Sequence, residues 1–215
     1  MTRTVLCFGD SNTHGTPPVP DLGASGRYSR DTRWPTLMAG HLGTAWQVIE
    51  EGHPGRTTVH DDPIEGAHRN GLTVLPSLLE SHWPLDVVIV MLGTNDLKGR
   101  FSVNATDIAL SLERLISVIR SFSCGPDGKD PGILLVAPPP IVEVGCLAEM
   151  FQGGAAKSHG LGLAIASAAT RANVHFLDAG AHIAVSPLDG IHYDEAAHAT
   201  LAVVLAQAMR EQFPT

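Results

Sequence analysis

The sequence predicts an α/β protein, a three-layer α/β/α sandwich built around a five-stranded parallel sheet. Short runs with apolar and β-branched residues alternate with longer segments whose apolar residues recur every three or four positions, which is typical of βαβ units. In the predicted strand over residues 86–92, every residue after Asp86 is apolar, as in a strand covered on both faces. The chain has 215 residues, 44% hydrophobic and 17% charged, and is expected to form one domain, residues 1–215.

Five segments are expected to form the strands of this sheet. Each contains β-branched or aromatic residues and is short, and they cover residues 4–9, 46–51, 86–92, 132–137 and 174–179. Short, right-handed connections between parallel strands favour the flavodoxin-like strand order.

Five further segments have the apolar spacing of helices. They cover residues 33–43, 70–82, 104–123, 154–172 and 194–212. The third is the clearest, because Asn104 can cap it and Asp107 lies in its first turn. Its apolar stripe is expected to face the core and consists of Ile108, Leu112, Leu115 and Ile119.

Composition limits the partners and the compartment that we expect. The net charge is −8 and the 14 Lys and Arg residues form no dense cluster, so nucleic acid is not an expected partner. The apolar stretch at the start is too short for a signal-peptide core, and nothing approaches a membrane span. Cys7 lies in an apolar run, and a disulfide framework is not expected. These features predict a cytoplasmic protein that does not bind a membrane.

The eleven histidines raise the question of a metal site. His53, His60 next to Asp61, and the pair His192 and His198 match neither the H-E-x-x-H nor the C-x-x-C pattern. Neither a metal ion nor another cofactor is therefore expected.

Four polar loops follow predicted strands at the carboxyl edge of the sheet, where open parallel sheets carry their active sites. The first contains Asp10, Ser11 and Asn12, and the others are residues 52–58, 93–96 and 189–192. A serine, a glycine, an asparagine and a histidine are thus expected at one edge, each from a separate loop.

These loops resemble the four sequence blocks of the SGNH hydrolases, the GDSL esterase and lipase superfamily, which is named for the same four residues. Here the blocks read CFGDS, EEG…RTT, MLGTND and DGIH, in the family's order and each after a predicted strand. The match spans nearly the whole chain, and the likeness is greatest to small bacterial arylesterases and acyltransferases. The resemblance implies a carboxylic ester hydrolase.

The resemblance and the chemistry of acyl transfer suggest the same roles. Ser11 is expected to be the nucleophile and His192 its general base and acid, while Asp189 would orient the imidazole and stabilise its cationic form. The ordinary alternatives are that Ser11 caps a helix and that His192 caps or pairs near a helix start. Asp10 and Asp96 are expected to be structural, accepting backbone N–H groups.

Three donors are expected to form an oxyanion hole: the N–H groups of Ser11 and Gly55 and the side-chain amide of Asn95. Aligning the second block with the family places Gly55 at the donor position, and Gly52 is then expected to permit a tight turn. The alternatives are that Gly55 serves shape alone and that Asn95 supports a turn.

By resemblance, four positions are expected to line the substrate pocket: Asn12, Thr94, Phe151 and Ile191. Asn12 stands where relatives usually have leucine, and His14 and Thr16 stand where relatives often have large aromatic residues. A polar entrance would suit a sugar acetate better than a lipid chain. Equally, these residues could form only a solvated rim.

The expected function is hydrolysis of short-chain (acetyl) esters of aryl alcohols and of acetylated carbohydrates through an acyl-enzyme, with acyl transfer to alcohols as a side activity. The family subgroup suggests a homo-oligomer. The alternatives are a lysophospholipase or thioesterase of the same fold and a carbohydrate-binding protein without turnover. A flavodoxin-like nucleotide binder is a weaker alternative, because GDSNTHG has no phosphate-binding lysine.

Overall fold

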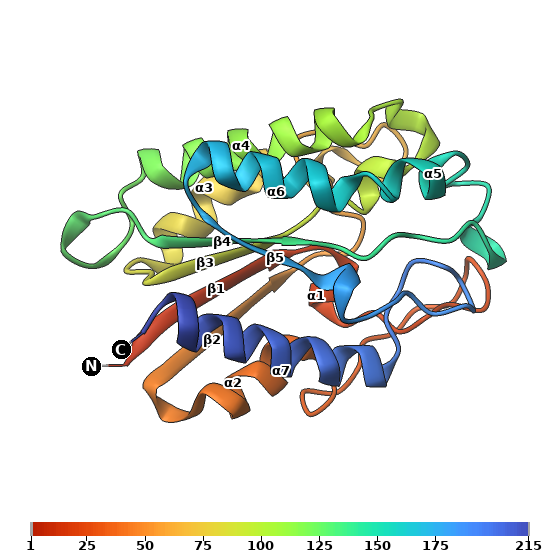
Figure 1. Ribbon diagram of the computed structural model, residues 1–215. Helices are drawn as coiled ribbons and strands as arrows, with labels where there is room; N and C mark the ends of the chain where they lie inside the picture. The colour runs from red at the N-terminus through yellow and green to blue at the C-terminus, as the bar shows by residue number, and fades with distance from the viewer. Residues whose placement is uncertain (1, 215) are drawn as a thin grey trace.

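The computed structural model describes residues 2–214 and centres on a sheet whose five strands all run parallel (Figure 1). The strands are β1 (Arg3–Gly9), β2 (Trp46–Gly52), β3 (Val87–Met91), β4 (Gly132–Ala137) and β5 (His175–Asp178). Their order across the sheet is β2-β1-β3-β4-β5, which confirms the predicted flavodoxin-like order.

Helices cover both faces of the sheet and complete the predicted three layers (Figure 1). One face carries α3 (Gly71–His82), α4 (Ala105–Ser121) and α6 (Leu161–Ala172). The other carries α2 (Trp34–Leu42) and α7 (Glu195–Gln212).

The first strand supplies side chains to both cores, because successive residues of a strand point to opposite faces. Leu6 and Phe8 pack with the layer of α3, α4 and α6, whereas Val5 and Cys7 pack with the layer of α2 and α7. All four side chains are buried. β1 is thus a central strand, and Cys7 is the buried core residue that the sequence predicted.

The start of α4 follows the sequence prediction closely. The Asn104 side chain accepts from the Thr106 and Asp107 N–H groups, and Asp107 accepts from the Asn104 N–H at 3.0 Å. This reciprocal capping satisfies N–H groups that a helix start leaves unpaired. The predicted stripe is buried, as expected, and comprises Ile108, Leu112, Leu115 and Ile119.

The segment expected to be one helix over residues 154–172 is two helices, α5 (Gly154–Ser158) and α6, with the break at His159 and Gly160. The Ser158 hydroxyl donates to the Ala155 carbonyl (2.7 Å) and accepts from the Ile141 N–H (3.1 Å). The bond from the Ile141 N–H ties the end of α5 to the loop after β4. Glycine at position 160 then favours a break, because glycine is a poor helix former.

The chain ends and the polar loops lie at opposite ends of the strands. Figure 1 shows both termini at the amino ends of the strands, while the short α1 (Ser11–His14) and the loops after β3 and β4 lie at the carboxyl ends. Within residues 2–214, no helix has the length and apolar character needed to cross a bilayer.

Candidate active site

The serine of the first loop lies on a tight turn directly after β1. Asp10 caps this turn, because its side chain accepts a hydrogen bond from the Asn12 N–H at 2.9 Å. Gly52 allows the turn to approach β2, since a Cβ atom there would lie 2.1 Å from the His14 nitrogen. The sequence suggested a tight turn at Gly52; instead, this glycine ends β2 and serves the close approach of α1.

Asp189 holds the histidine and its loop with four hydrogen bonds. Its Oδ2 atom lies 2.7 Å from the His192 Nδ1 atom and accepts from the Val19 N–H at 2.8 Å. Its Oδ1 atom accepts from the N–H groups of Ile191 and His192, both at 3.0 Å. Because Nδ1 of the imidazole is engaged, Nε2 is the nitrogen left to exchange a proton.

The environment of Asp189 keeps its carboxylate ionised. Burial disfavours the charged form, but the hydrogen bonds from the His192 ring and N–H outweigh this effect and lower the pKa of Asp189 to about 2. A charged, buried carboxylate next to an imidazole stabilises the imidazolium form of the ring.

The three expected oxyanion donors lie around one cavity, which Ser11, Gly55 and Asn95 all line. Within residues 2–214, neither the Ser11 nor the Gly55 N–H donates a hydrogen bond to the protein. The backbone of Gly55 has φ +73°, a conformation that favours glycine. The Asn95 amide donates to the Arg56 carbonyl at 3.1 Å, which orients it.

Asp10 lies next to this amide and is buried. Its Oδ2 atom accepts a long hydrogen bond, 3.4 Å, from Asn95 Nδ2. Burial raises the pKa of Asp10 to about 6, although the Asn12 N–H and the charges of His192 and Arg56 act in the opposite direction. The carboxyl group therefore joins the serine turn to the asparagine loop, a structural role like the one predicted.

Asp96 joins the second and third loops in a similar way. Its carboxylate accepts from the Thr58 N–H, with both oxygens at 3.1 Å, and from the Thr58 hydroxyl. Asp96 is fully buried, and burial raises its pKa. It is thus a structural residue that fixes the loop carrying Asn95.

A cavity of about 240 Å³ brings the expected residues together. Ser11, Gly55, Asn95 and His192 all line it. Most of the remaining wall is apolar and includes Val19, Leu22, Leu147, Met150, Phe151 and Ile191. Among residues 2–214, no three His, Cys, Asp or Glu side chains are grouped so that they could hold a metal ion.

Two of the four expected substrate-lining residues line this cavity, Phe151 and Ile191, and two do not. The expectation for Asn12 is corrected, because its side chain is buried and donates to the Ile191 carbonyl (3.2 Å) and accepts from the Tyr193 N–H (3.1 Å). Asn12 therefore ties the serine turn to the histidine loop. Thr94 is 3% exposed, does not line the cavity, and directly precedes the short helix η3 (Asn95–Leu97).

Other lining residues were not predicted from the sequence. Thr16 lines the cavity and His14 does not, although the His14 ring lies 3.1 Å from the Thr16 hydroxyl. The sequence marks residues 15–26 as a Pro- and Gly-rich loop, but nothing in it shows that this loop folds back over the sheet edge. The unpredicted lining residues include Val19, Leu22, Pro54, Glu65, Lys98, Leu147 and Met150.

The arrangement defines a class of protein. A serine hydroxyl, a histidine paired with a buried carboxylate, and free N–H donors around one cavity are the groups that nucleophilic acyl transfer requires. On an open parallel sheet, with the groups at the carboxyl ends of the strands, they define a hydrolase of the serine acyl-transfer class.

Comparison with known proteins supports this class. The structure is similar to the native aryl esterase of M. smegmatis, with a TM-score of 0.93 and 39% identity over 98% of this chain and 99% of that one. It is also similar to Est24, a carbohydrate acetylesterase from Sinorhizobium meliloti, with a TM-score of 0.94 and 38% identity over 99% and 100% of the two chains. No curated protein sequence matches the chain.

Residues 7–200 match the GDSL-like lipase/acylhydrolase family. The chain belongs to this family, as the four sequence blocks predicted. It is a carboxylic ester hydrolase with an α/β fold.

Proposed function

We propose that the protein is a serine esterase that hydrolyses short-chain, acetyl esters of aryl alcohols and of acetylated carbohydrates through an acyl-enzyme. The observation that carries this proposal is the single cavity lined by Ser11, Gly55, Asn95 and His192. Its volume of about 240 Å³ lies below the range of about 300–1,000 Å³ for drug-sized ligands, which favours a small acyl group.

In the proposed first step, the Ser11 hydroxyl attacks the ester carbonyl carbon while His192 Nε2 takes the hydroxyl proton. The tetrahedral intermediate collapses, the alcohol leaves with that proton, and the acetyl group stays on the Ser11 oxygen. Water then attacks the acyl carbon and gives a proton to His192 Nε2. The second tetrahedral intermediate collapses with cleavage of the bond to the Ser11 oxygen, acetate leaves, and the Ser11 oxygen takes the proton back from His192. Asp189 stabilises the imidazolium form in both steps.

The oxyanion of each intermediate would be stabilised by the N–H groups of Ser11 and Gly55 and by the Asn95 amide. Removing one such donor typically lowers kcat by about 10²- to 10³-fold. The two backbone donors are free of protein acceptors within residues 2–214, so neither has to break a bond before the oxyanion binds. The Asn95 amide donates to the Arg56 carbonyl and to Asp10, and it would exchange its long 3.4 Å bond to Asp10 for one to the oxyanion.

The cavity wall and the similar solved structures support the two proposed kinds of ester, aryl esters and acetylated carbohydrates. The apolar part, which includes Val19, Leu147 and Phe151, suits an aryl ring. The structural neighbours include an aryl esterase and carbohydrate acetylesterases, and this chain would act on esters of the same kinds.

Two alternatives differ in what the cavity must hold. A lysophospholipase or thioesterase would need room for a long acyl chain, which the small cavity disfavours. A carbohydrate-binding protein without turnover is expected to lack at least one of the reacting groups. This chain has Ser11, His192 and Asp189, which disfavours that alternative.

Three further parts of the proposal have their own tests. Acyl transfer to alcohols would be measured as ester formation in water–alcohol mixtures, and a homo-oligomer by sedimentation or light scattering. A cytoplasmic location would be measured by cell fractionation. Free thiols at Cys7, Cys124 and Cys146 suit a reducing compartment.

The experiment that tests the proposal compares wild type and Ser11→Ala on p-nitrophenyl esters of increasing acyl length and on acetylated sugars. We expect acetate esters to react fastest and Ser11→Ala to lose at least about 10³-fold in kcat. Ser77→Ala, an exposed helix serine, is the matched control and should behave as wild type. Wild-type turnover by Ser11→Ala, or a preference for long acyl chains, would reject the proposal.

A further inference from the structure

A charged pair lines the cavity, and the reaction steps proposed above do not use it. Lys98 is 2% exposed; its Nζ atom forms an ion pair with Glu65 Oε1 and lies 3.8 Å from Asp62 Oδ2. Both Lys98 and Glu65 line the same cavity as Ser11. The pairing compensates the cost of burying the Lys98 charge, and the position of both residues in the cavity wall allows them to contact a ligand.

The neighbours of Lys98 compensate its charge but leave hydrogen-bonding capacity. Arg100 donates to Asp62 at 2.9 Å, and Arg69 Nε lies 3.7 Å from Glu65 Oε2, so each carboxylate is shared between cations. The ammonium group has three N–H donors, of which Glu65 engages one, because Asp62 at 3.8 Å lies beyond hydrogen-bond distance; the second Glu65 oxygen retains acceptor sites. The pair thus offers an N–H donor and a carboxylate acceptor side by side, which suits neighbouring hydroxyl groups, whereas an anion would meet the Glu65 carboxylate.

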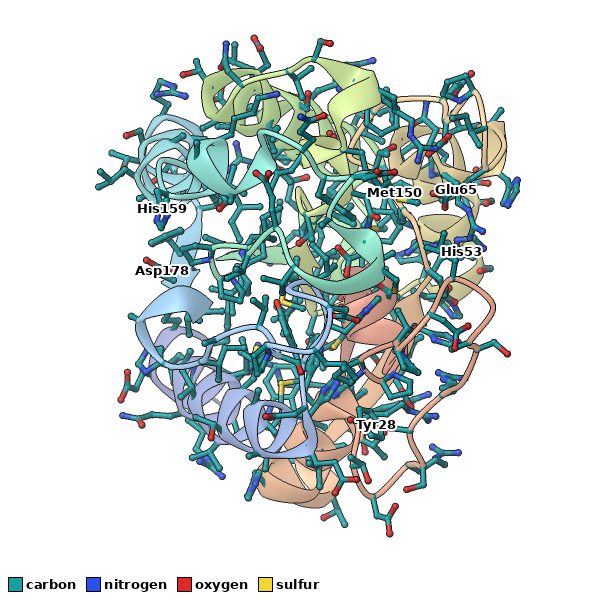
Figure 2. The ribbon with its side chains drawn as sticks, turned by 90° about the vertical axis from the view of Figure 1, so that its right-hand side faces the viewer. Tyr28, His53, Glu65, Met150, His159 and Asp178 are labelled. Atoms are coloured by element: carbon teal, nitrogen blue, oxygen red, sulfur yellow. The ribbon has the colours of Figure 1, made fainter. Side chains whose placement is uncertain are left out.

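The position of the pair indicates which part of an ester it meets. A Cβ atom on Gly55 would lie 2.5 Å from Glu65 Oε2, so this carboxylate adjoins a proposed oxyanion donor. Figure 2 shows Glu65 beside Met150 on the face formed by the carboxyl ends of the strands. An acetyl group carries no hydroxyl, so hydroxyl groups that reach the pair belong to the alcohol part of the ester.

We propose that Lys98 and Glu65 form a subsite that selects alcohols with free neighbouring hydroxyl groups, such as partly acetylated sugars. Lys98 donates to one hydroxyl oxygen, and Glu65 accepts from the neighbouring hydroxyl. Charge-assisted hydrogen bonds of this kind are stronger than those between neutral groups. An ester whose alcohol part carries no further hydroxyl groups would make neither hydrogen bond to the pair, so the enzyme would bind this ester more weakly. This inference rests on the proposed esterase function.

The test uses two acetate esters of similar size, a monoacetylated methyl glucoside and cyclohexyl acetate, which lacks free hydroxyl groups. Wild type should have the higher kcat/KM on the sugar ester. Lys98→Met should lower the ratio of the two kcat/KM values by about 10- to 100-fold, the effect of losing a hydrogen bond to a charged group. Glu65→Gln keeps an acceptor oxygen but loses its charge, so it should lower the ratio by a smaller factor of about 3- to 10-fold. Lys129→Met and Glu80→Gln, at exposed positions, are matched controls and should keep the wild-type ratio.

The possible results separate this inference from the proposed function. If wild type shows no preference for the sugar ester, or both subsite variants keep the wild-type ratio, the subsite is wrong although Ser11-dependent hydrolysis remains. If Ser11→Ala hydrolyses both esters as wild type does, the proposed function itself is wrong. Glu65→Gln keeps the size of the side chain, so it decides the matter if Lys98→Met does not fold.

Discussion

Asp189 connects two separate segments of the active site through its carboxylate, the histidine loop and the loop after α1. It binds the His192 ring, two N–H groups of the histidine loop, and the N–H of Val19 from the loop after α1. The sequence predicted the contact with His192 from a spacing of three residues. It did not predict the contact with Val19, which lies 170 positions away.

Replacing Asp189 with asparagine tests this role. Asp189→Asn keeps the size of the side chain but removes the charge that stabilises the His192 imidazolium, so kcat on p-nitrophenyl acetate should fall by about 10²- to 10⁴-fold. Asp178→Asn, on β5 outside the cavity, is the control. A variant of Asp189 with wild-type kcat would show that the imidazole needs no carboxylate.

Asp10 should make stability depend on pH. Below its ordinary pKa of 3.8, both the folded and unfolded chains hold the proton; as pH rises through the folded value of about 6, the unfolded chain has already ionised. Between the ordinary pKa of 3.8 and the folded value of about 6, the ionisation of Asp10 should therefore lower the free energy of unfolding by about 3 kcal/mol.

Urea unfolding of wild type and Asp10→Asn between about pH 4 and about pH 7 measures this effect. As pH rises, Asp10→Asn should become more stable relative to wild type, because the variant has no charge to bury at this position. His53 and His198, whose pKa values burial lowers to about 4, are present in both proteins and cancel in the difference. Parallel pH profiles would refute the assignment.

Asn12 shows what the sequence could not predict at this scale. A motif gives the position of a residue along the chain but not the direction of its side chain. Asn12 directly follows the serine, yet its amide is used by the Ile191 carbonyl and the Tyr193 N–H, more than 170 positions away along the chain.

At the scale of elements, periodicity predicted most of the fold and failed at one break within a predicted helix. Every predicted strand lies within one residue of its observed ends. The helix expected over residues 154–172 breaks at His159 and Gly160, directly after Ser158, whose hydroxyl binds backbone groups of α5 and of the loop after β4. The second of these partners is distant in sequence, so the apolar pattern did not reveal it.

The contact between β2 and α1 gives a prediction at the same scale. In Gly52→Ala, the new methyl group would lie 2.1 Å from the His14 nitrogen, so α1 must shift, at a cost of about 1–3 kcal/mol. Because α1 carries Ser11, a shift of about 1 Å should lower kcat by about 10²-fold.

Gly40→Ala is the control for this change, since no atom lies within 4 Å of a Cβ there. It lies inside α2 and should raise the free energy of unfolding by about 0.5–1 kcal/mol without changing kcat. Thermal or urea unfolding and ester assays measure both variants. Equal behaviour of the two would show that β2 and α1 tolerate a Cβ between them.

At the scale of the whole molecule, the sheet topology accounts for the meeting of three of the four loops, whereas the histidine loop follows β5 at the far edge of the sheet and is held to the serine turn by the hydrogen bonds of Asn12. The order β2-β1-β3-β4-β5 places β1 next to both β2 and β3, so the loops with Ser11, Gly55 and Asn95 are neighbours. The alternating pattern of strands and helices was enough to predict this edge. The family resemblance placed Phe151 in the outer cavity wall, but the rest of that wall was not predictable, because residues 16–24 and 147–150 have no regular pattern to place them.

The central claim, that Ser11 becomes acylated, is tested most directly by covalent labelling. Diethyl p-nitrophenyl phosphate reacts with a serine activated by a base, and peptide mass spectrometry locates the adduct. The account predicts one adduct per chain, on Ser11, formed in step with the loss of esterase activity and absent from Ser11→Ala. Complete inactivation with the adduct on another residue, or full activity with Ser11 labelled, would contradict it.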